Sequence, residues 1–242
     1  MLKNSDWIIV NAITYKIHAI KDIDAMRIEI MEQLKHLIDF DSSSFYLSQQ
    51  DGDGLCRPVG IAYSKEDMVE YINRFQKVDY SEGLMATGKN IAYRESDIIE
   101  DAVRVQSDYY KAVYEVQGWH YSLHLNICIN EEFLGVMSFF RKKGKEDFTY
   151  DDIFVLDMIK DHLALRLSKE RGKKLTVDEC VKKYKLSKRE AEVLRLLLSN
   201  CSMEEITKQL TISINTLHKH AGHIYAKTGT TSRVQLFEKI QV

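Results

Sequence analysis

The stretch ITKQLTISINTLHKHAGHIYAKTG, residues 206–229, decides the fold of the C-terminal part of the chain. Apolar residues recur at helical spacing on both sides of the short polar segment 211–213. This spacing predicts two helices, 202–210 and 214–228, with a three-residue turn between them. Such a pair is typical of a helix-turn-helix corner.

The second of these helices is predicted to have two different faces, because successive residues turn by about 100°. One face is expected to pack inward; it holds Leu217, Ala221, Ile224 and Thr228, with His220 at its margin. The opposite face is expected to point outward; it holds Asn215, His218, Lys219, Gly222 and Ala226.

Helix starts are marked throughout this region by Ser/Thr-x-x-Glu/Gln pairs. In such a capping box the hydroxyl and the Glu or Gln each satisfy a backbone N–H of the first helical turn. The pairs are Thr176 with Glu179, Ser187 with Glu190, Ser202 with Glu205, and Ser232 with Gln235. We therefore expect a small all-α unit of short helices.

The run LSKREAEVLRLLLSN and the helix pair that follows it resemble the LuxR/FixJ-type DNA-binding domain. The positions that match its pattern are Leu186, Ser187, Arg189, Glu190, Glu192, Val193, Leu194, Ser202, Glu205, Ile206, Leu210, Ser213, Thr216, His220, Ile224, Lys227, Gly229 and Arg233. The resemblance implies a tetrahelical fold, double-stranded DNA as partner and a role in transcription regulation. His218 and Gly222 differ from the residues that family members often carry at these positions. These differences are expected to affect which DNA sequence is read and not the fold.

The residues expected to bind DNA fall into two groups. Asn215, His218 and Lys219 can bond base edges in the major groove, while Gly222 allows the helix backbone to approach closely. Most of the affinity is expected from phosphate contacts. The candidates for those contacts are Lys188, Arg189, Ser213, Thr216, Lys227 and Arg233.

Metal and cofactor sites are not predicted. His220 and His223 lie one helical turn apart and could share an ion, but His220 stands at the family's usual histidine position and is expected to be structural. The four cysteines are scattered without a C-x-x-C pair, which favours reduced thiols over zinc ligands.

Charge divides the chain unevenly. Residues 1–171 hold 21 Lys+Arg and 29 Asp+Glu, a net −8, whereas residues 172–242 hold 13 and 7, a net +6. A basic segment of this kind favours contact with a polyanion. We place the domain boundary between these segments, at Gly172, where a predicted helix over 150–171 ends.

That long helix carries two apolar rows. One row holds Leu156, Ile159, Leu163 and Leu167, and the other holds Phe154, Met158 and Leu165. One of the two rows can cover a sheet while the other meets a partner helix in a homodimer; alternatively, both rows are buried within one domain. A last helix, 232–241, offers a second dimerisation surface through Val234, Leu236, Phe237 and Ile240.

The first 171 residues are predicted to form an α+β domain with an antiparallel sheet and flanking helices. The expected order is a helix over 17–40, a hairpin around 51–54, a helix over 65–77, a strand at 91–94, a helix near 107–116, strands 119–130 and 132–143, and the closing helix. This order resembles a GAF-type sensor domain, which implies a ligand pocket.

Strand 119–130 alternates between apolar and polar residues. The alternation places Trp119 and Tyr121 in one row and His120 and His124 in the other. The polar row is either an exposed sheet face or the floor of a pocket. The candidate ligand-binding residues are Trp119, Tyr121, Tyr110, Tyr114, His120 and His124.

These patterns predict a bacterial, cytoplasmic, homodimeric transcription regulator that responds to a small molecule and contacts RNA polymerase. Two alternatives stay open: an autoinducer-binding regulator of the quorum-sensing type, and a protein-interaction adaptor whose helical domain does not bind DNA. The chain lacks a phosphate-binding loop, a nucleophile elbow and a membrane-length apolar run, so neither an enzyme nor a membrane protein is expected.

Overall fold

The computed structural model describes residues 2–49, 54–85, 87–171, 175–199 and 201–241. The chain forms two compact units, Met1–Arg171 and Gly172–Val242. No helix within the described ranges is both long and apolar enough to span a membrane.

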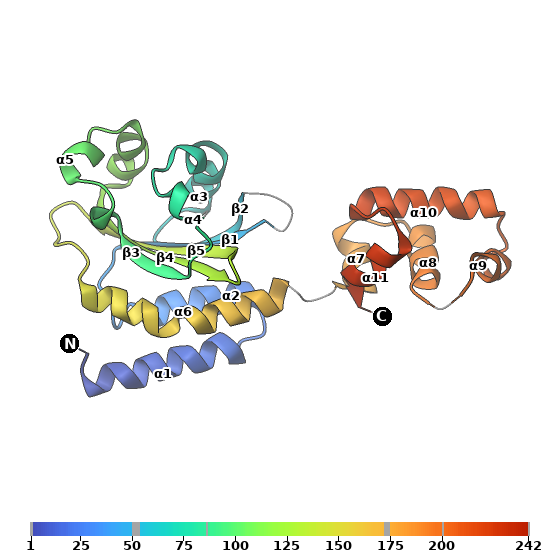
Figure 1. Ribbon diagram of the computed structural model, residues 1–242, viewed down its shortest axis with the longest axis horizontal. Helices are drawn as coiled ribbons and strands as arrows, with labels where there is room; N and C mark the ends of the chain where they lie inside the picture. Colours follow the sequence, from blue (N-terminus) through green and yellow to red (C-terminus); the bar gives the residue numbers. More distant parts are fainter. Residues whose placement is uncertain (1, 50–53, 86, 172–174, 200, 242) are drawn as a thin grey trace. The chain divides into compact units, whose positions relative to one another are not determined.

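A five-stranded antiparallel sheet with the order β2-β1-β5-β4-β3 lies at the centre of the first unit (Figure 1). Its strands are β1 (Ser42–Ser48), β2 (Leu55–Ile61), β3 (Ile91–Arg94), β4 (Trp119–Ile129) and β5 (Glu132–Lys142). Asn130 and Glu131 join β4 to β5 with positive φ, as a tight two-residue hairpin requires. Both predicted hairpins are confirmed, although residues 51–53 of the first turn lie outside the described residues.

Helices cover both faces of this sheet (Figure 1). One face packs against α2 (Ile23–Leu34) and α6 (Tyr150–Arg171), and α1 (Asn4–Ala19) packs against both helices. The other face is covered by short segments: α3 (Lys65–Glu70), η1 (Tyr71–Phe75), η2 (Gln76–Val78), α4 (Glu82–Met85), η3 (Glu95–Asp97), α5 (Asp101–Arg104) and η4 (Tyr110–Glu115). The α+β fold with flanking helices is confirmed.

The helix expected over residues 17–40 is wrong in its bounds. Residue 17 belongs to α1, which ends at Ala19, and a new helix begins at Ile23. Asp22 separates the two because its carboxylate accepts a hydrogen bond from the Ala25 N–H at 2.7 Å, which makes it an N-cap.

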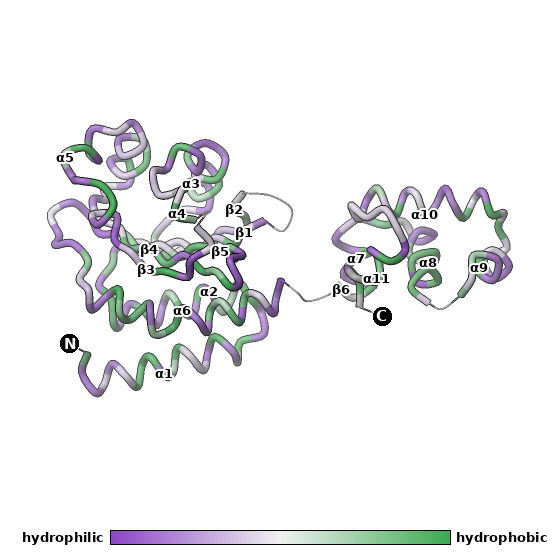
Figure 2. Tube along the Cα trace, in the orientation of Figure 1, coloured by the Kyte–Doolittle hydropathy of each residue, from purple (hydrophilic) through white to green (hydrophobic). Residues whose placement is uncertain are grey.

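The long helix over 150–171 is confirmed as α6, and apolar and polar positions alternate along it (Figure 2). Its first apolar row is buried against the sheet, with Leu156, Ile159 and Leu163 at 0% exposure. The second row is not buried, because Phe154, Met158 and Leu165 keep about 40% of their surface. The alternative in which one domain buries both rows is therefore wrong.

The second unit contains α7 (Val177–Lys183), α8 (Lys188–Leu197), α9 (Met203–Leu210), α10 (Ile214–Thr228) and α11 (Arg233–Lys239). A short parallel pair, β6 (Leu175–Thr176) and β7 (Ile240–Gln241), joins its two ends. The first three capping boxes form as predicted, at the starts of α7, α8 and α9. At the fourth, Ser232 caps α11, but the Gln235 side chain accepts from the Thr231 N–H instead.

The last helix has little apolar surface left for a partner. It ends at Lys239 rather than at residue 241, because Ile240 pairs with Leu175 in the parallel ladder. Leu236 and Ile240 are buried inside the unit, while Val234 stays exposed. The prediction that Leu236 and Ile240 are available to a partner is wrong, since the unit's own core buries them; dimerisation through the rest of this helix stays a prediction.

Candidate nucleic-acid interface and ligand pocket

Both ends of α10 are fixed by local geometry. Ser213 caps its start, where its hydroxyl accepts from the Thr216 N–H at 3.1 Å. Gly229 ends it in the left-handed conformation, with φ of 64°. Thr211 takes the same conformation at the turn after α9, with φ of 53°. Thr211 and Ser213, at the two ends of the turn, set the direction in which α10 leaves the corner, and Gly229 fixes where the helix ends.

The two faces of α10 are arranged as the helical spacing predicts. Leu217, Ala221, Ile224 and Thr228 are buried, and His220 is half-buried. Asn215, His218, Lys219, Gly222 and Ala226 are exposed. The predicted outward face is thus confirmed as an exposed surface of this unit.

Gly222 has no structural reason to be glycine within this unit. It lies in the middle of α10 with ordinary helical backbone, and a Cβ added there would meet no heavy atom within 4 Å. Glycine in a helix costs about 0.5–1 kcal/mol relative to alanine. The described contacts of the chain do not offset this cost.

Two of the predicted phosphate contacts are arginines that bond inside the domain. The Arg189 guanidinium donates to the Leu210 carbonyl at 2.7 Å, at the C-terminal end of α9, and to Glu192. The Arg233 guanidinium donates to the Leu197 carbonyl at 2.5 Å and to the Ser199 carbonyl. Each guanidinium satisfies carbonyl groups that a helix end leaves unpaired.

Lys227 also has a partner inside the domain. Its ammonium donates to the Glu190 carboxylate at 2.7 Å, and this hydrogen bond lowers the pKa of Glu190. The same carboxylate accepts from the Ser187 N–H, so it fastens α10 to the start of α8. Of the basic phosphate candidates, Lys188 is the one that is exposed without such a bond among the described contacts.

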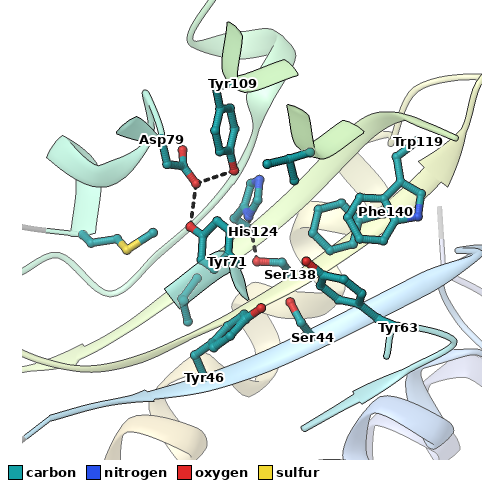
Figure 3. A pocket seen from close by; sticks show the side chains of 13 residues that line it. Ser44, Tyr46, Tyr63, Tyr71, Asp79, Tyr109, Trp119, His124, Ser138 and Phe140 are labelled. Atoms are coloured by element: carbon teal, nitrogen blue, oxygen red, sulfur yellow. Dashed lines mark hydrogen bonds between the residues drawn. The ribbon is translucent and has the colours of Figure 1, made fainter. Parts of the chain in front are cut away.

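The second face of the sheet in the N-terminal unit holds a pocket (Figure 3). Its walls are mostly aromatic: Tyr46, Tyr63, Tyr71, Tyr109, Trp119 and Phe140. The Trp119 and Phe140 rings stack with centroids 3.9 Å apart. Tyr71 belongs to η1 and Tyr109 directly precedes η4, both π-helical segments, which occur frequently at functional sites.

Asp79 supplies a carboxylate at one end of this pocket (Figure 3). Its Oδ2 accepts from the Tyr71 hydroxyl and from the Tyr109 hydroxyl, each at 2.7 Å. Its Oδ1 accepts from the N–H and the hydroxyl of Ser81 at 2.8 and 2.7 Å. All four bonds come from neutral donors.

His124 lies on the floor of the pocket and belongs to a chain of hydrogen bonds. Its two ring nitrogens lie 2.8 Å from the hydroxyls of Ser122 and Ser138. Burial lowers the pKa of His124 to about 4, so the ring is neutral at neutral pH. Ser122 contacts the Tyr114 hydroxyl at 2.9 Å, and this hydroxyl donates to Glu95 at 2.8 Å.

Glu95 ends that chain in a buried ion pair. Arg104 donates to its carboxylate at 2.9 Å, and each side chain is only 2% exposed. Burial raises the pKa of Glu95 to about 7 despite this partner. The guanidinium also lies over the rings of Tyr110 and Tyr114.

The six predicted ligand residues are separated by the fold. Trp119 and His124 line the pocket, whereas Tyr121 packs on the opposite face of the sheet. The predicted common row of Trp119 and Tyr121 is wrong because a register shift between them turns the strand. The polar row is mostly buried rather than exposed, and of its two histidines His124 lines the pocket while His120 does not.

Tyr110, Tyr114 and His120 do not line the pocket. The Tyr110 hydroxyl is 2.7 Å from Nδ1 of His120, and Nε2 of the same ring is 3.5 Å from the Asp101 carboxylate. Sequence reasoning did not find the pocket residues Tyr46, Tyr63, Tyr71, Asp79, Ser138 and Phe140. They come from separate elements, and the one available signal was the abundance of tyrosine, at 13 residues.

Metal binding has no support in the arrangement of side chains. Within the described ranges, no three or more His, Cys, Asp or Glu side chains are grouped so that they could hold an ion. His223 instead lies 3.9 Å from the Glu190 carboxylate.

Comparison with known proteins identifies the C-terminal unit. Residues 184–239 match the family described as bacterial regulatory proteins, luxR family. They form a luxR-family helix-turn-helix domain. A Mycobacterium tuberculosis protein named as an HTH-type transcriptional regulator is 41% identical over 54 residues, which are 22% of this chain and 6% of that protein. The chain thus spans a small part of that relative's length.

Outside the luxR-family domain, the N-terminal unit has the fold of a GAF domain. The GAF domain of a phosphoenolpyruvate-protein phosphotransferase from Coxiella burnetii aligns with 70% of this chain and 97% of that chain, with a TM-score of 0.51 and 13% identity. Escherichia coli SdiA aligns with 97% of this chain and 95% of that chain, with a TM-score of 0.48 and 17% identity. The predicted GAF-like fold is confirmed.

Proposed function

We propose that the chain is a transcription regulator that binds double-stranded DNA through α10 and is controlled by a small molecule held in its GAF-like unit. The observation that carries the proposal is the free outward face of α10 within a luxR-family helix-turn-helix domain. A helix of this kind enters the major groove, where side chains reach base edges.

The described contacts support a division of the DNA-binding candidates by role. Asn215, His218 and Lys219 are exposed and are proposed to contact bases, with Gly222 beside them. Lys188, Ser213 and Thr216 are proposed to contact phosphates. Arg189, Lys227 and Arg233 act first on the domain itself, since they bond to helix ends or to Glu190.

The test is a titration of the full chain against duplexes selected from a random pool, followed by fluorescence anisotropy at several salt concentrations. Binding is expected to weaken steeply with salt, because phosphate contacts release counterions. Lys219→Ala should cost about 1–3 kcal/mol of binding free energy. Lys77→Ala, an exposed lysine in the other unit, is the matched control and should have no effect.

The adaptor alternative predicts a different outcome in the same titration. A helical domain that docks on a protein would show weak duplex binding with no response to Lys219→Ala. Such a result from a correctly folded chain would contradict the proposal that the chain is a DNA-binding regulator.

The aromatic pocket with Asp79 favours a small-molecule effector. A quorum-sensing-type autoinducer is the alternative identity for that effector. Native mass spectrometry of freshly purified full chain is expected to detect a retained small molecule, and its mass would separate an autoinducer from other effectors.

We also propose a homodimer through the exposed faces of α1 and α6. Trp7, Ile8 and Tyr15 on α1 are exposed, as are Phe154, Met158 and Leu165 on α6, and the Trp7 and Phe154 rings are in edge contact. Surface of this kind marks interaction sites. Light scattering of the full chain should show a dimer, and the Met158→Glu variant should be a monomer. A monomeric wild-type chain would contradict the proposed homodimer.

A regulator of this kind acts where the chromosome lies, so we propose the bacterial cytoplasm as its compartment and RNA polymerase as a further partner. We propose no catalytic activity for either unit. In vitro transcription with purified polymerase tests this partnership and separates activation from repression.

A further inference from the structure

The polar end of the pocket presents hydrogen-bond acceptors. An ionised carboxylate can only accept hydrogen bonds, so the hydroxyl protons of Tyr71 and Tyr109 both point at Asp79. Each hydroxyl oxygen keeps lone pairs for another donor. A ligand group that reaches this end must therefore donate hydrogen bonds.

The pocket also has a negative charge without a cation. Among the 13 lining residues, all in the described part of the chain, there is no Lys or Arg. His124 is neutral because burial lowers its pKa to about 4. Asp79 is 7% exposed and is bonded by neutral donors. A buried carboxylate in such surroundings favours a positively charged partner.

The walls of the pocket favour the same charge. Aromatic rings carry a negative face that attracts ammonium groups, most strongly when water is excluded. Tyr71 and Tyr109 place rings next to Asp79, and Tyr46, Tyr63, Trp119 and Phe140 continue the wall.

We infer that this pocket binds a small molecule with a protonated amine, whose ammonium lies at the hydroxyl oxygens of Tyr71 and Tyr109 in front of Asp79. The apolar part of the ligand packs on Trp119 and Phe140. The inference rests on the proposed function, because it names the ligand class of the proposed sensing site. The cavity has a volume of about 20 Å³, enough for one water-sized group, so it can admit the ammonium group, and the wall side chains must shift to admit the apolar part of the ligand.

The test compares four probes of similar size on the full chain by ligand-observed NMR: n-propylammonium, 1-propanol, propionamide and propionate. The dissociation constant of n-propylammonium should be roughly 10- to 100-fold lower than those of the two neutral probes. Propionate should be the weakest, because Asp79 repels it.

Variants assign the effect to the pocket. Asp79→Asn should weaken n-propylammonium roughly 10-fold or more while 1-propanol changes little. Tyr109→Phe keeps the ring and the carboxylate and should weaken the amine less. Asp108→Asn removes an exposed carboxylate next to Tyr109 and should change nothing, which makes it the matched control.

Equal affinity for the charged and neutral probes, no binding of any probe, or full amine binding by Asp79→Asn together with Tyr109→Phe would overturn the ligand class. Duplex binding is measured on the same samples. If the chain binds DNA but not amines, the proposed ligand class is wrong and the proposed regulator function still stands. If the chain binds amines but not DNA, the proposed regulator function is wrong.

Discussion

The luxR-family domain and the GAF-like unit place their candidate sites by different means. In α10 the outward residues, from Asn215 to Ala226, lie within 11 positions of one another on one helix, so their geometry follows from helical periodicity. The pocket gathers Tyr46 from β1, Tyr71 from η1, Asp79 from a loop and His124 from β4. The difference teaches that a local site can be recognised from spacing, whereas a non-local site needs the sheet topology.

The largest expected effect is on stability: a core substitution in one unit should lower the free energy of unfolding of that unit and not of the other. Leu217 is fully buried in the luxR-family domain, so Leu217→Ala should lower its free energy of unfolding by about 2–5 kcal/mol. Both tryptophans, Trp7 and Trp119, belong to the GAF-like unit. In guanidinium denaturation, Leu217→Ala should therefore lower the midpoint that is detected by far-UV circular dichroism. The midpoint that is detected by tryptophan fluorescence should stay unchanged.

The neighbour of Leu217 is the control for this change. His218 is exposed, and His218→Ala should alter stability by less than about 0.5 kcal/mol. A shift of the fluorescence transition by Leu217→Ala would show that the two units unfold together, and the comparison between them would fail.

A smaller effect concerns pH and the GAF-like unit. Burial raises the pKa of Glu95 to about 7, above its value in an unfolded chain. Between pH 4.5 and 7 the folded state therefore holds a proton that the unfolded state has lost, so stability should fall as pH rises through this window. The loss is on the order of 3 kcal/mol by proton linkage, and Glu95→Gln should remove it.

The measurement is the tryptophan-detected denaturation midpoint across this pH range. Glu100→Gln replaces an exposed carboxylate near Glu95 in sequence and should keep the wild-type pH dependence. Glu95 faces Arg104, Tyr80, Tyr114 and Asp79, and all of them stay in place in both variants. Identical pH profiles for wild type and Glu95→Gln would contradict a protonated Glu95.

The smallest expected effect concerns Gly222 in α10. Gly222→Ala should raise the stability of the luxR-family domain by roughly 0.5–1 kcal/mol, because a helix interior favours alanine and a Cβ there meets no atom. The same change should weaken duplex binding several-fold if the helix backbone approaches DNA at this position. Anisotropy and denaturation on the same protein give both numbers.

Ala226→Gly makes the reverse change one turn further along the same face. It should lower stability by a similar amount and leave duplex affinity nearly unchanged. Unaltered DNA binding by Gly222→Ala would mean that close approach is not the reason for glycine there.

Sequence spacing was sufficient for most of the helical unit, and its errors have a common cause. The spacing correctly predicted the faces of α10 and three capping boxes, because each of these features depends on residues that are close together in the sequence. It did not predict the bonds that Arg189, Lys227 and Arg233 make inside the domain, and their phosphate contacts stay a prediction. Their partners, Leu210, Glu190 and Leu197, lie 21 to 37 positions away and become neighbours only when the helices pack.

In the GAF-like unit the sequence predicted strands, hairpins and α6 but not which side chains meet. Strict alternation along β4 placed Trp119 with Tyr121, and a register shift moved Trp119 to the pocket face. A bulge of this kind depends on how the neighbouring strand pairs, which period-two reasoning does not include.

The sequence by itself determined the helix-turn-helix, the outward face of α10 and the antiparallel sheet with its closing helix, because hydrogen bonds and side-chain periodicity between nearby residues fix these features. Tertiary structure alone decided the aromatic pocket, the acceptor end at Asp79 and the buried pair of Glu95 and Arg104. Those arrangements join residues from separate elements, and burial then sets their charge and hydrogen-bonding, which no residue carries in its own local sequence.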